Sequence, residues 1–134
     1  MIVLSDTTAI NYLVLTGYVE ILPALFNEIL IPTAVQSELL HARAPDVVRQ
    51  WISQLPAWCA IREPARIEPI PLGLGEVEVI SLAIEMNADL LLMDDRHALR
   101  EAEARGLNVA GTLDVLQAAA QRDLLDLPVA IAKL

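Results

Sequence analysis

The stretch from Leu90 to Asp95 constrains the fold most strongly, because four apolar residues run directly into two adjacent carboxylates. A continuous apolar run of this length is typical of a strand buried on both faces, as in a parallel sheet covered by helices. Asp94 and Asp95 would then lie at the carboxyl end of that strand, where open α/β sheets bind their ligands. One of the two also suits the N-cap of a helix that starts near Arg96.

The same arrangement opens the chain, where a short apolar run leads to Asp6 and then to Thr7 and Thr8. The carboxyl ends of parallel strands share one edge of a sheet, so we expect Asp6 to lie near Asp94 and Asp95. Neighbouring carboxylates repel each other, and burying them is costly unless a cation or a proton lies between them. An apolar strand has no evident structural need for Asp6, which makes a functional interpretation attractive.

Strand and helix patterns alternate along the whole chain, so we predict a three-layer α/β/α fold around a mostly parallel sheet. The 134 residues suffice for a single domain, residues 1–134. The expected strands cover residues 2–6, 28–31, 58–62, 89–93 and 107–110. The expected helices cover residues 7–16, 18–26, 32–42, 46–55, 74–86, 95–105 and 113–122, with a short last helix from residue 127. We expect Thr7 or Thr8 to cap the first of them and Asp46 the fourth, and Gly17 and Asn87 to end the helices that precede them. Residues 63–73, rich in proline, read as a surface connection.

Composition narrows the class of protein. No apolar run approaches the roughly 18 residues of a spanning helix, and no basic region precedes the first apolar run, so we expect a cytoplasmic protein with no membrane association. The single Cys59 excludes an internal disulfide, and two histidines, His41 and His97, make a histidine-rich metal site unfavourable. A net charge of −9 argues against broad electrostatic binding of nucleic acid but permits a local basic patch.

Two more acids complete a candidate cluster. Glu38 lies on the helix after the second strand, and Glu76 lies in the first turn of the helix before the central strand. Hard divalent cations such as Mg²⁺ and Mn²⁺ prefer oxygen ligands, and such a site can polarise a phosphodiester and lower the pKa of bound water. The alternatives are a solvated helix-face position for Glu38 and a favourable charge at a helix N-terminus for Glu76.

Four segments, in order and at plausible spacing, resemble the successive motifs of the PIN-domain family. They are residues 5–8 (Ser-Asp-Thr-Thr), 35–39 (Val-Gln-Ser-Glu-Leu), 72–83 (beginning Leu-Gly-Leu-Gly-Glu) and 88–96 (ending Met-Asp-Asp-Arg). The Gly-Glu and Asp-Asp-Arg forms, with Gly-Leu and Gly-Thr pairs downstream, look most like the subgroup of VapC-like toxins. The resemblance covers nearly the whole chain.

That resemblance implies a Rossmann-like fold and a Mg²⁺- or Mn²⁺-dependent endoribonuclease. It implies Asp6, Glu38, Glu76 and Asp95 as catalytic metal ligands, with Asp94 competing with Asp95 for the fourth place. Glu76 stands where many relatives carry aspartate. The resemblance also makes Thr7 and Thr8 hydroxyl neighbours that orient Asp6. From its position alone, Arg96 lies just beyond the cluster, where it would contact phosphate; the alternative is pairing with Glu101, Glu103 or solvent.

The same likeness implies an RNA substrate, a small antitoxin protein that covers the site, and a homodimer. A catalytically silent PIN-fold interaction domain is the main alternative, because the net charge of −9 and Glu76 are compatible with it. A phosphate-accepting signalling domain is a weaker alternative. Such domains need a lysine beside the phosphoryl group, and the only lysine here is Lys133 near the C-terminus.

Overall fold

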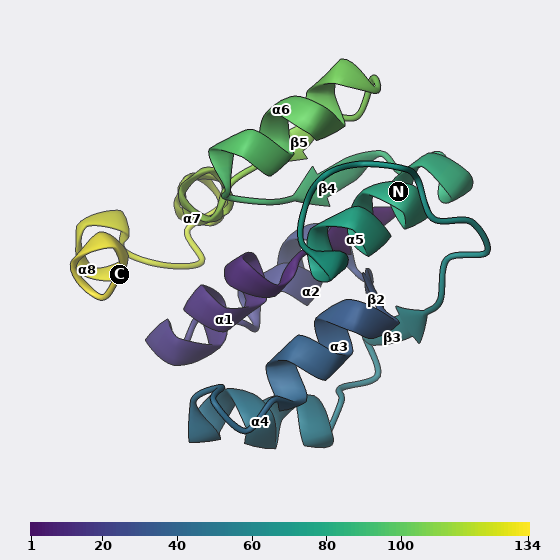
Figure 1. The fold of residues 1–134 in the computed structure, drawn as a ribbon. Coiled ribbons are helices and arrows are strands. Elements are labelled where there is room, and N and C mark those ends of the chain that lie inside the picture. The colour runs from purple at the N-terminus through teal and green to yellow at the C-terminus, as the bar shows by residue number, and fades with distance from the viewer.

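A computed structural model describes residues 1–134 and shows a five-stranded sheet with helices on both faces (Figure 1). The strands are β1 (Val3–Ser5), β2 (Ile29–Pro32), β3 (Cys59–Arg62), β4 (Leu90–Leu92) and β5 (Val109–Ala110). Their order across the sheet is β3-β2-β1-β4-β5, and every neighbouring pair is parallel. The chain therefore builds outward from β1 to one edge and then returns to the other side of β1 with β4. The boundary between β1 and β4 is the topological switch point, where such sheets open a ligand crevice.

Eight helices surround this sheet. They are α1 (Thr7–Thr16), α2 (Ile21–Phe26), α3 (Thr33–Leu40), α4 (Asp46–Ser53), α5 (Leu74–Met86), α6 (Arg96–Ala104), α7 (Thr112–Gln121) and α8 (Leu127–Ala132). None of them combines the length and the apolar character that crossing a bilayer requires. In Figure 1, α5 and α6 lie on one side of the strands, and α1, α2 and α7 lie on the other.

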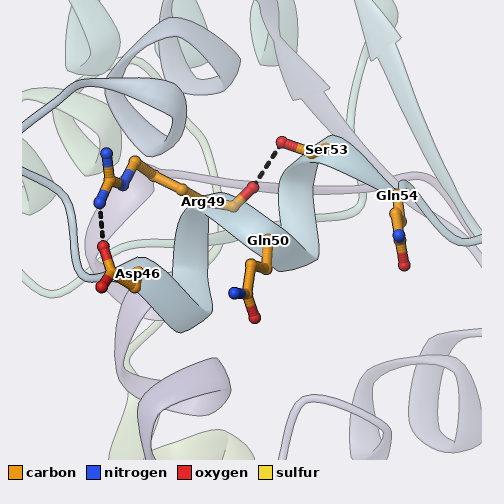
Figure 2. A pocket seen from close by; sticks show the side chains of 5 residues that line it. All are labelled: Asp46, Arg49, Gln50, Ser53 and Gln54. Carbon is orange, nitrogen blue, oxygen red and sulfur yellow. Dashed lines mark hydrogen bonds and ion pairs between the residues drawn. The ribbon is translucent and has the colours of Figure 1, made fainter.

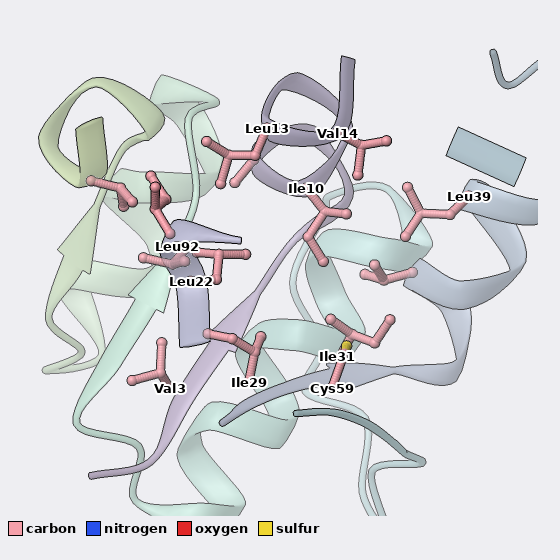
Figure 3. Close-up of a cluster of buried hydrophobic side chains, with 14 of the residues drawn as sticks. Val3, Ile10, Leu13, Val14, Leu22, Ile29, Ile31, Leu39, Cys59 and Leu92 are labelled. Carbon is pink, nitrogen blue, oxygen red and sulfur yellow. The ribbon is translucent and has the colours of Figure 1, made fainter. Parts of the chain in front are cut away.

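Alternating side chains of the strands feed two separate apolar cores, one for each face of the sheet. On β1, Val3 belongs to the core under α1, α2 and α7, whereas Leu4 belongs to the core under α5 and α6. On β4, Leu92 and Leu91 divide in the same way. Figure 3 shows the first of these cores. Because both faces are buried, the central strands must be apolar throughout, as the sequence of residues 90–93 indicated.

The α/β/α architecture predicted from the sequence is confirmed, and the sheet is parallel in all of its pairings. Every predicted strand and helix exists, although β1, β4 and β5 are shorter than predicted, at three, three and two residues. The predicted stops at Gly17 and Asn87 are confirmed, and both adopt the left-handed conformation that ends a helix.

Two predicted caps are wrong. Asp6, and neither Thr7 nor Thr8, is the N-cap of α1, and Pro45 precedes α4 where Asp46 was expected as the cap. Asp46 is instead the first residue of α4 and forms an ion pair with Arg49. In both places the N-cap precedes the residue expected to cap the helix, a displacement that hydrophobic periodicity alone does not resolve.

We expect Leu91→Ala to destabilise the protein by about 2–5 kcal/mol, because Leu91 is fully buried between β4 and the α5–α6 layer. Denaturant unfolding of the variant and of the wild type measures this loss. Leu113→Ala removes the same atoms from a half-exposed position on α7 and serves as the control. Equal losses in the two variants would contradict the two-core description.

Candidate active site

The pairing of β1 with β4 brings the first acidic residues together. Ser5 is in register with Leu92, and the backbone N–H of Asp6 donates to the carbonyl oxygen of Leu92 at 3.0 Å. Asp6 and Asp94 therefore follow adjacent strands by one and two residues at the carboxyl edge of the sheet. The parallel pairing of β1 with β4 is therefore what brings Asp6 close to Asp94 and Asp95, as the sequence predicted.

Asp6 is the most deeply buried carboxylate of the cluster, with 3% of its surface exposed. Its Oδ1 accepts a hydrogen bond from the backbone N–H of Ala9 at 3.0 Å, so it has a structural role as the cap of α1. The sequence-based argument that nothing structural requires Asp6 is therefore wrong. This single hydrogen bond does not offset the cost of ionising Asp6 in its buried, acidic surroundings, however. Burial, and then the charges of Asp94, Glu76 and Glu38, raise the pKa of Asp6 to about 7 against the opposing effect of the Ala9 hydrogen bond.

Glu38 and Glu76 approach Asp6 from two helices that pack against each other, α3 and α5. The three carboxylates share a pocket of about 220 Å³ with Thr7, Thr8 and Gly73. Gly75 is what allows the approach, because a Cβ at that position would lie 2.9 Å from Cδ of Glu38. Burial, followed by the charge of Asp95, raises the pKa of Glu76, and Glu38 contributes in the same direction. The sequence-predicted acids are thus brought to one place.

Thr7 and Thr8 line the same pocket but do not bind Asp6. The hydroxyl of Thr7 donates to Oε2 of Glu38, and Asp6 is held instead by the backbone of its own helix. The expectation that these hydroxyls orient Asp6 is corrected in this respect. Thr7 is the first residue of α1, so its side chain reaches across to α3, whereas the side chain of Asp6 folds back over the helix start.

Asp94 and Asp95 have different surroundings. Asp94 accepts hydrogen bonds from the backbone N–H of Thr112 at 2.8 Å and from the Thr112 hydroxyl at 2.5 Å. Asp95 is the N-cap of α6 and accepts from the N–H of Ala98 at 3.0 Å. Asp94 acts on the pKa of Asp6, and Asp95 acts on the pKa of Glu76, so the two border the cluster from different sides. One of the pair does cap the helix, as the sequence indicated.

Residues that the sequence did not single out hold the cluster in place. Glu78 accepts hydrogen bonds from the Thr33 hydroxyl and the Ala34 N–H, both at 3.0 Å, and so fixes the start of α3 to α5. Gly111 lies so close to Asp94 that an added Cβ would come within 2.9 Å of Oδ1. The hydrogen-bonded partners, Thr33 with Glu78 and Thr112 with Asp94, are 45 and 18 residues apart in the chain, so no local pattern pairs them.

The donor set has the chemistry that a hard divalent cation requires, because it consists of carboxylate and hydroxyl oxygens. In the geometry described here, no three acidic, histidine or cysteine side chains close around one point tightly enough to enclose an ion. Mg²⁺ usually keeps several waters and binds through one or two carboxylates, so it does not demand such an enclosure. Asp6, Glu38 and Glu76 line one pocket and offer oxygen ligands of this kind.

A hollow on α4 offers no comparable chemistry. Figure 2 shows that its lining side chains, among them Asp46, Arg49 and Ser53, come from α4 and from Gln54, the residue that follows it. Asp46 pairs with Arg49, and the Ser53 hydroxyl donates to the Arg49 carbonyl oxygen at 2.6 Å. Nε of Arg49 is buried without a hydrogen-bond partner, but no second element brings a further group to this hollow.

Comparison with known proteins identifies the family. The sequence matches the family DUF3368, described as a PIN domain, over residues 2–134. No curated protein matches the chain. The fold is similar to that of the PilT N-terminus domain protein SSO1118 from the archaeon Sulfolobus solfataricus P2, with a TM-score of 0.65 and 20% identity over 89% of this chain and 93% of that one. The chain belongs to the PIN-domain family, whose members are generally nucleases that use divalent metals.

The raised pKa of Asp6 predicts an unusual pH dependence in metal-free buffer. The unfolded carboxyl ionises near 3.8 and the folded one near 7, so the folded state binds more protons between these values. The free energy of unfolding therefore falls as the pH rises from 4 to 7 and levels off above 7. A difference of this size between the folded and unfolded pKa values corresponds to about 4 kcal/mol.

We expect Asp6→Asn to reduce this dependence to the part that the raised pKa of Glu76 contributes, and to be more stable than the wild type at pH 8, since asparagine also caps helices well. Denaturant unfolding at pH 4, 5.5 and 8 in a chelator measures both proteins. Asp126→Asn changes an exposed cap on α8 and is the control, with its pH profile unchanged. A profile of Asp6→Asn parallel to that of the wild type would show that Asp6 ionises normally.

Proposed function

We propose that this protein is a Mg²⁺- or Mn²⁺-dependent endoribonuclease of the VapC-like toxin type. The observation that carries the proposal is the burial of Asp6 among three like-charged carboxylates at the switch point of the sheet. A group of this kind, ionised with difficulty and placed in a pocket, is a functional-site candidate on physical grounds. Membership of a family that generally contains metal-using nucleases agrees with it.

Asp6, Glu38 and Glu76 are the side chains that would hold the ion, with Asp95 or Asp94 as the fourth acid. A bound divalent ion offsets the carboxylate charges, polarises the phosphodiester and lowers the pKa of a water molecule. The chain's own part is to fix the acids. The Ala9 N–H holds Oδ1 of Asp6, and the Thr7 hydroxyl holds Oε2 of Glu38. Each carboxyl group keeps its second oxygen for other partners.

Asp94 and Asp95, the two candidates for the fourth acidic ligand, have different surroundings in the structure. Both oxygens of Asp94 accept hydrogen bonds from Thr112, so this side chain is fixed beside Asp6. One oxygen of Asp95 caps α6, and the side chain is exposed beside Glu76. A carboxylate with a free oxygen is the better ligand, which favours Asp95. Asp94 then stabilises the edge of the site and adds negative charge.

Arg96 is placed to bind a phosphate of the substrate. It is the exposed first residue of α6, directly after Asp95, and it has no carboxylate partner within ion-pair distance. An unpaired guanidinium beside an acidic cluster attracts the phosphodiester that the carboxylates would otherwise repel. This supports RNA as the substrate despite the net charge of −9.

We expect the protein to cleave single-stranded RNA in Mg²⁺ or Mn²⁺ and to lose at least about 100-fold of that activity in Asp6→Asn, because this change removes a charged oxygen ligand. Gel-resolved cleavage of a labelled RNA under single-turnover conditions measures the rates. Asp126→Asn is the matched control and retains the wild-type rate, since it alters a helix cap outside the site. Equal cleavage by the wild type and by Asp6→Asn would place the active site elsewhere.

Calorimetric titration with Mn²⁺ separates this function from a silent interaction domain. A nuclease of this type binds the ion in the wild type and more weakly in Asp6→Asn. Failure of the intact protein to bind Mn²⁺ would favour the silent alternative, in which the fold serves only to contact other proteins.

Two protein partners complete the proposal. A small antitoxin would cover the acidic pocket, where an arginine of that partner would replace the charge of the ion. A second copy of the chain would cover exposed apolar residues of α1 and α4, two helices that pack together. Tyr12 and Leu15 lie three residues apart on α1, and Val47 lies on α4, each between 42% and 48% exposed. Exposed apolar side chains on two helices that pack together support self-association.

We expect Leu15→Glu to convert the dimer to a monomer, because it places a charge in the apolar contact. Light scattering after size-exclusion chromatography gives the mass of each species. Ile131→Glu alters a similarly exposed residue on α8 and is expected to remain dimeric. A monomeric wild type, or dissociation by both variants alike, would contradict this interface.

A further inference from the structure

A second pocket adjoins the acidic one and has a different character. It has a volume of about 360 Å³ and shares Thr7 and Glu38 with the acidic pocket. Its other polar side chains are Asn11 of α1, and His41 and Arg43 of the turn between α3 and α4. Glu38 therefore stands between a pocket of carboxylates and a pocket whose remaining polar groups are neutral or positive.

Arg43 is free to bind an anion. It is exposed, and no carboxylate lies within ion-pair distance of it, although the chain has eighteen acids and only nine basic residues. In contrast, Arg49 and Arg105 each form an ion pair. An unpaired arginine on a turn, next to a cluster of like-charged acids, has the fork geometry that matches a phosphate group.

His41 adds a hydrogen-bond donor with a defined tautomer. Its Nδ1 accepts the backbone N–H of Arg43 at 3.0 Å. In the neutral ring, an accepting Nδ1 leaves the proton on Nε2, so Nε2–H is a donor. The half-buried amide of Asn11 supplies further donors on the wall formed by α1. All three side chains can therefore donate to phosphate or base oxygens.

We propose that this pocket, the Arg43 subsite, binds the phosphate of an RNA nucleotide next to the one cleaved. The proposal rests on the ribonuclease function proposed above and adds the path of the substrate. The strand passes Arg96 at the start of α6, then the acidic pocket, and then the Arg43 subsite at the α3–α4 turn. A polyanion held by cations on both sides of the carboxylates is kept at the site without a broadly basic surface.

The test compares Arg43→Gln with Arg105→Gln, which removes the same charge from the far end of α6. Binding of a fluorescent single-stranded RNA is measured by anisotropy in the Asp6→Asn background, where the RNA stays intact, at salt concentrations from about 50 to 200 mM. Arg43→Gln is expected to weaken binding by about tenfold and to reduce the salt slope by about one, the effect of losing one phosphate contact. Arg43→Lys retains the charge and is expected to recover part of the affinity.

Single-turnover cleavage in the otherwise wild-type protein provides a second measurement. Arg43→Gln raises the RNA concentration needed for half-maximal rate and leaves the maximal rate and the Mn²⁺ affinity unchanged, because it contacts neither the ion nor the reacting bond. Equal RNA affinities for Arg43→Gln and Arg105→Gln overturn the Arg43 subsite while leaving the nuclease intact. A wild type that neither binds nor cleaves RNA overturns both proposals. Loss of Mn²⁺ binding in Arg43→Gln would show that Arg43 acts through the acidic cluster, and it overturns the subsite.

Discussion

Repulsion between carboxylates at the carboxyl edge of the sheet is the constraint on which the rest of the site depends. Parallel pairing of β1 with β4 fixes Asp6 beside Asp94, and packing of α3 on α5 adds Glu38 and Glu76. The fold gains nothing from this charge by itself, since burial and the neighbouring acids raise the pKa of Asp6 to about 7. Selection for stability alone would place neutral residues there. The arrangement is therefore best understood as a binding site for a positively charged group.

The architecture could be predicted from the sequence because its signals are local. The apolar run of residues 90–93 and the alternation of strand and helix patterns define the parallel sheet, and Gly17 and Asn87 end their helices as expected. Parallel pairing of the strands then places Asp6 near Asp94, so this approach could be predicted without knowledge of any individual contact. The helix starts were less accessible, because Asp6 and Thr7 are both good N-caps and periodicity does not distinguish adjacent residues.

The supporting contacts of the site could not be predicted, because they join segments far apart in the chain. Thr112 holds Asp94 across 18 residues, and Glu78 caps the start of α3 across 44. Their residue types are ordinary at those positions, and only the packing of α5 against α3 gives Glu78 its partner. The two glutamates of α5 illustrate the limit. Glu76 and Glu78 are two residues apart, yet one lines the acidic pocket and the other fixes the helix that carries Glu38.

The distribution of basic residues explains how so acidic a protein could hold a polyanion. A chain with a net charge of −9 does not attract a polyanion over a long range. Salt at physiological concentration also screens the field of each charge beyond about 8 Å. In the proposed ribonuclease, binding would therefore depend on cations at the site itself: an ion among the carboxylates, and the unpaired Arg96 and Arg43. In this arrangement the ion and the arginines would each add to the attraction. Without the ion the carboxylates repel the phosphate, and without the arginines the flanking nucleotides have no counter-charge.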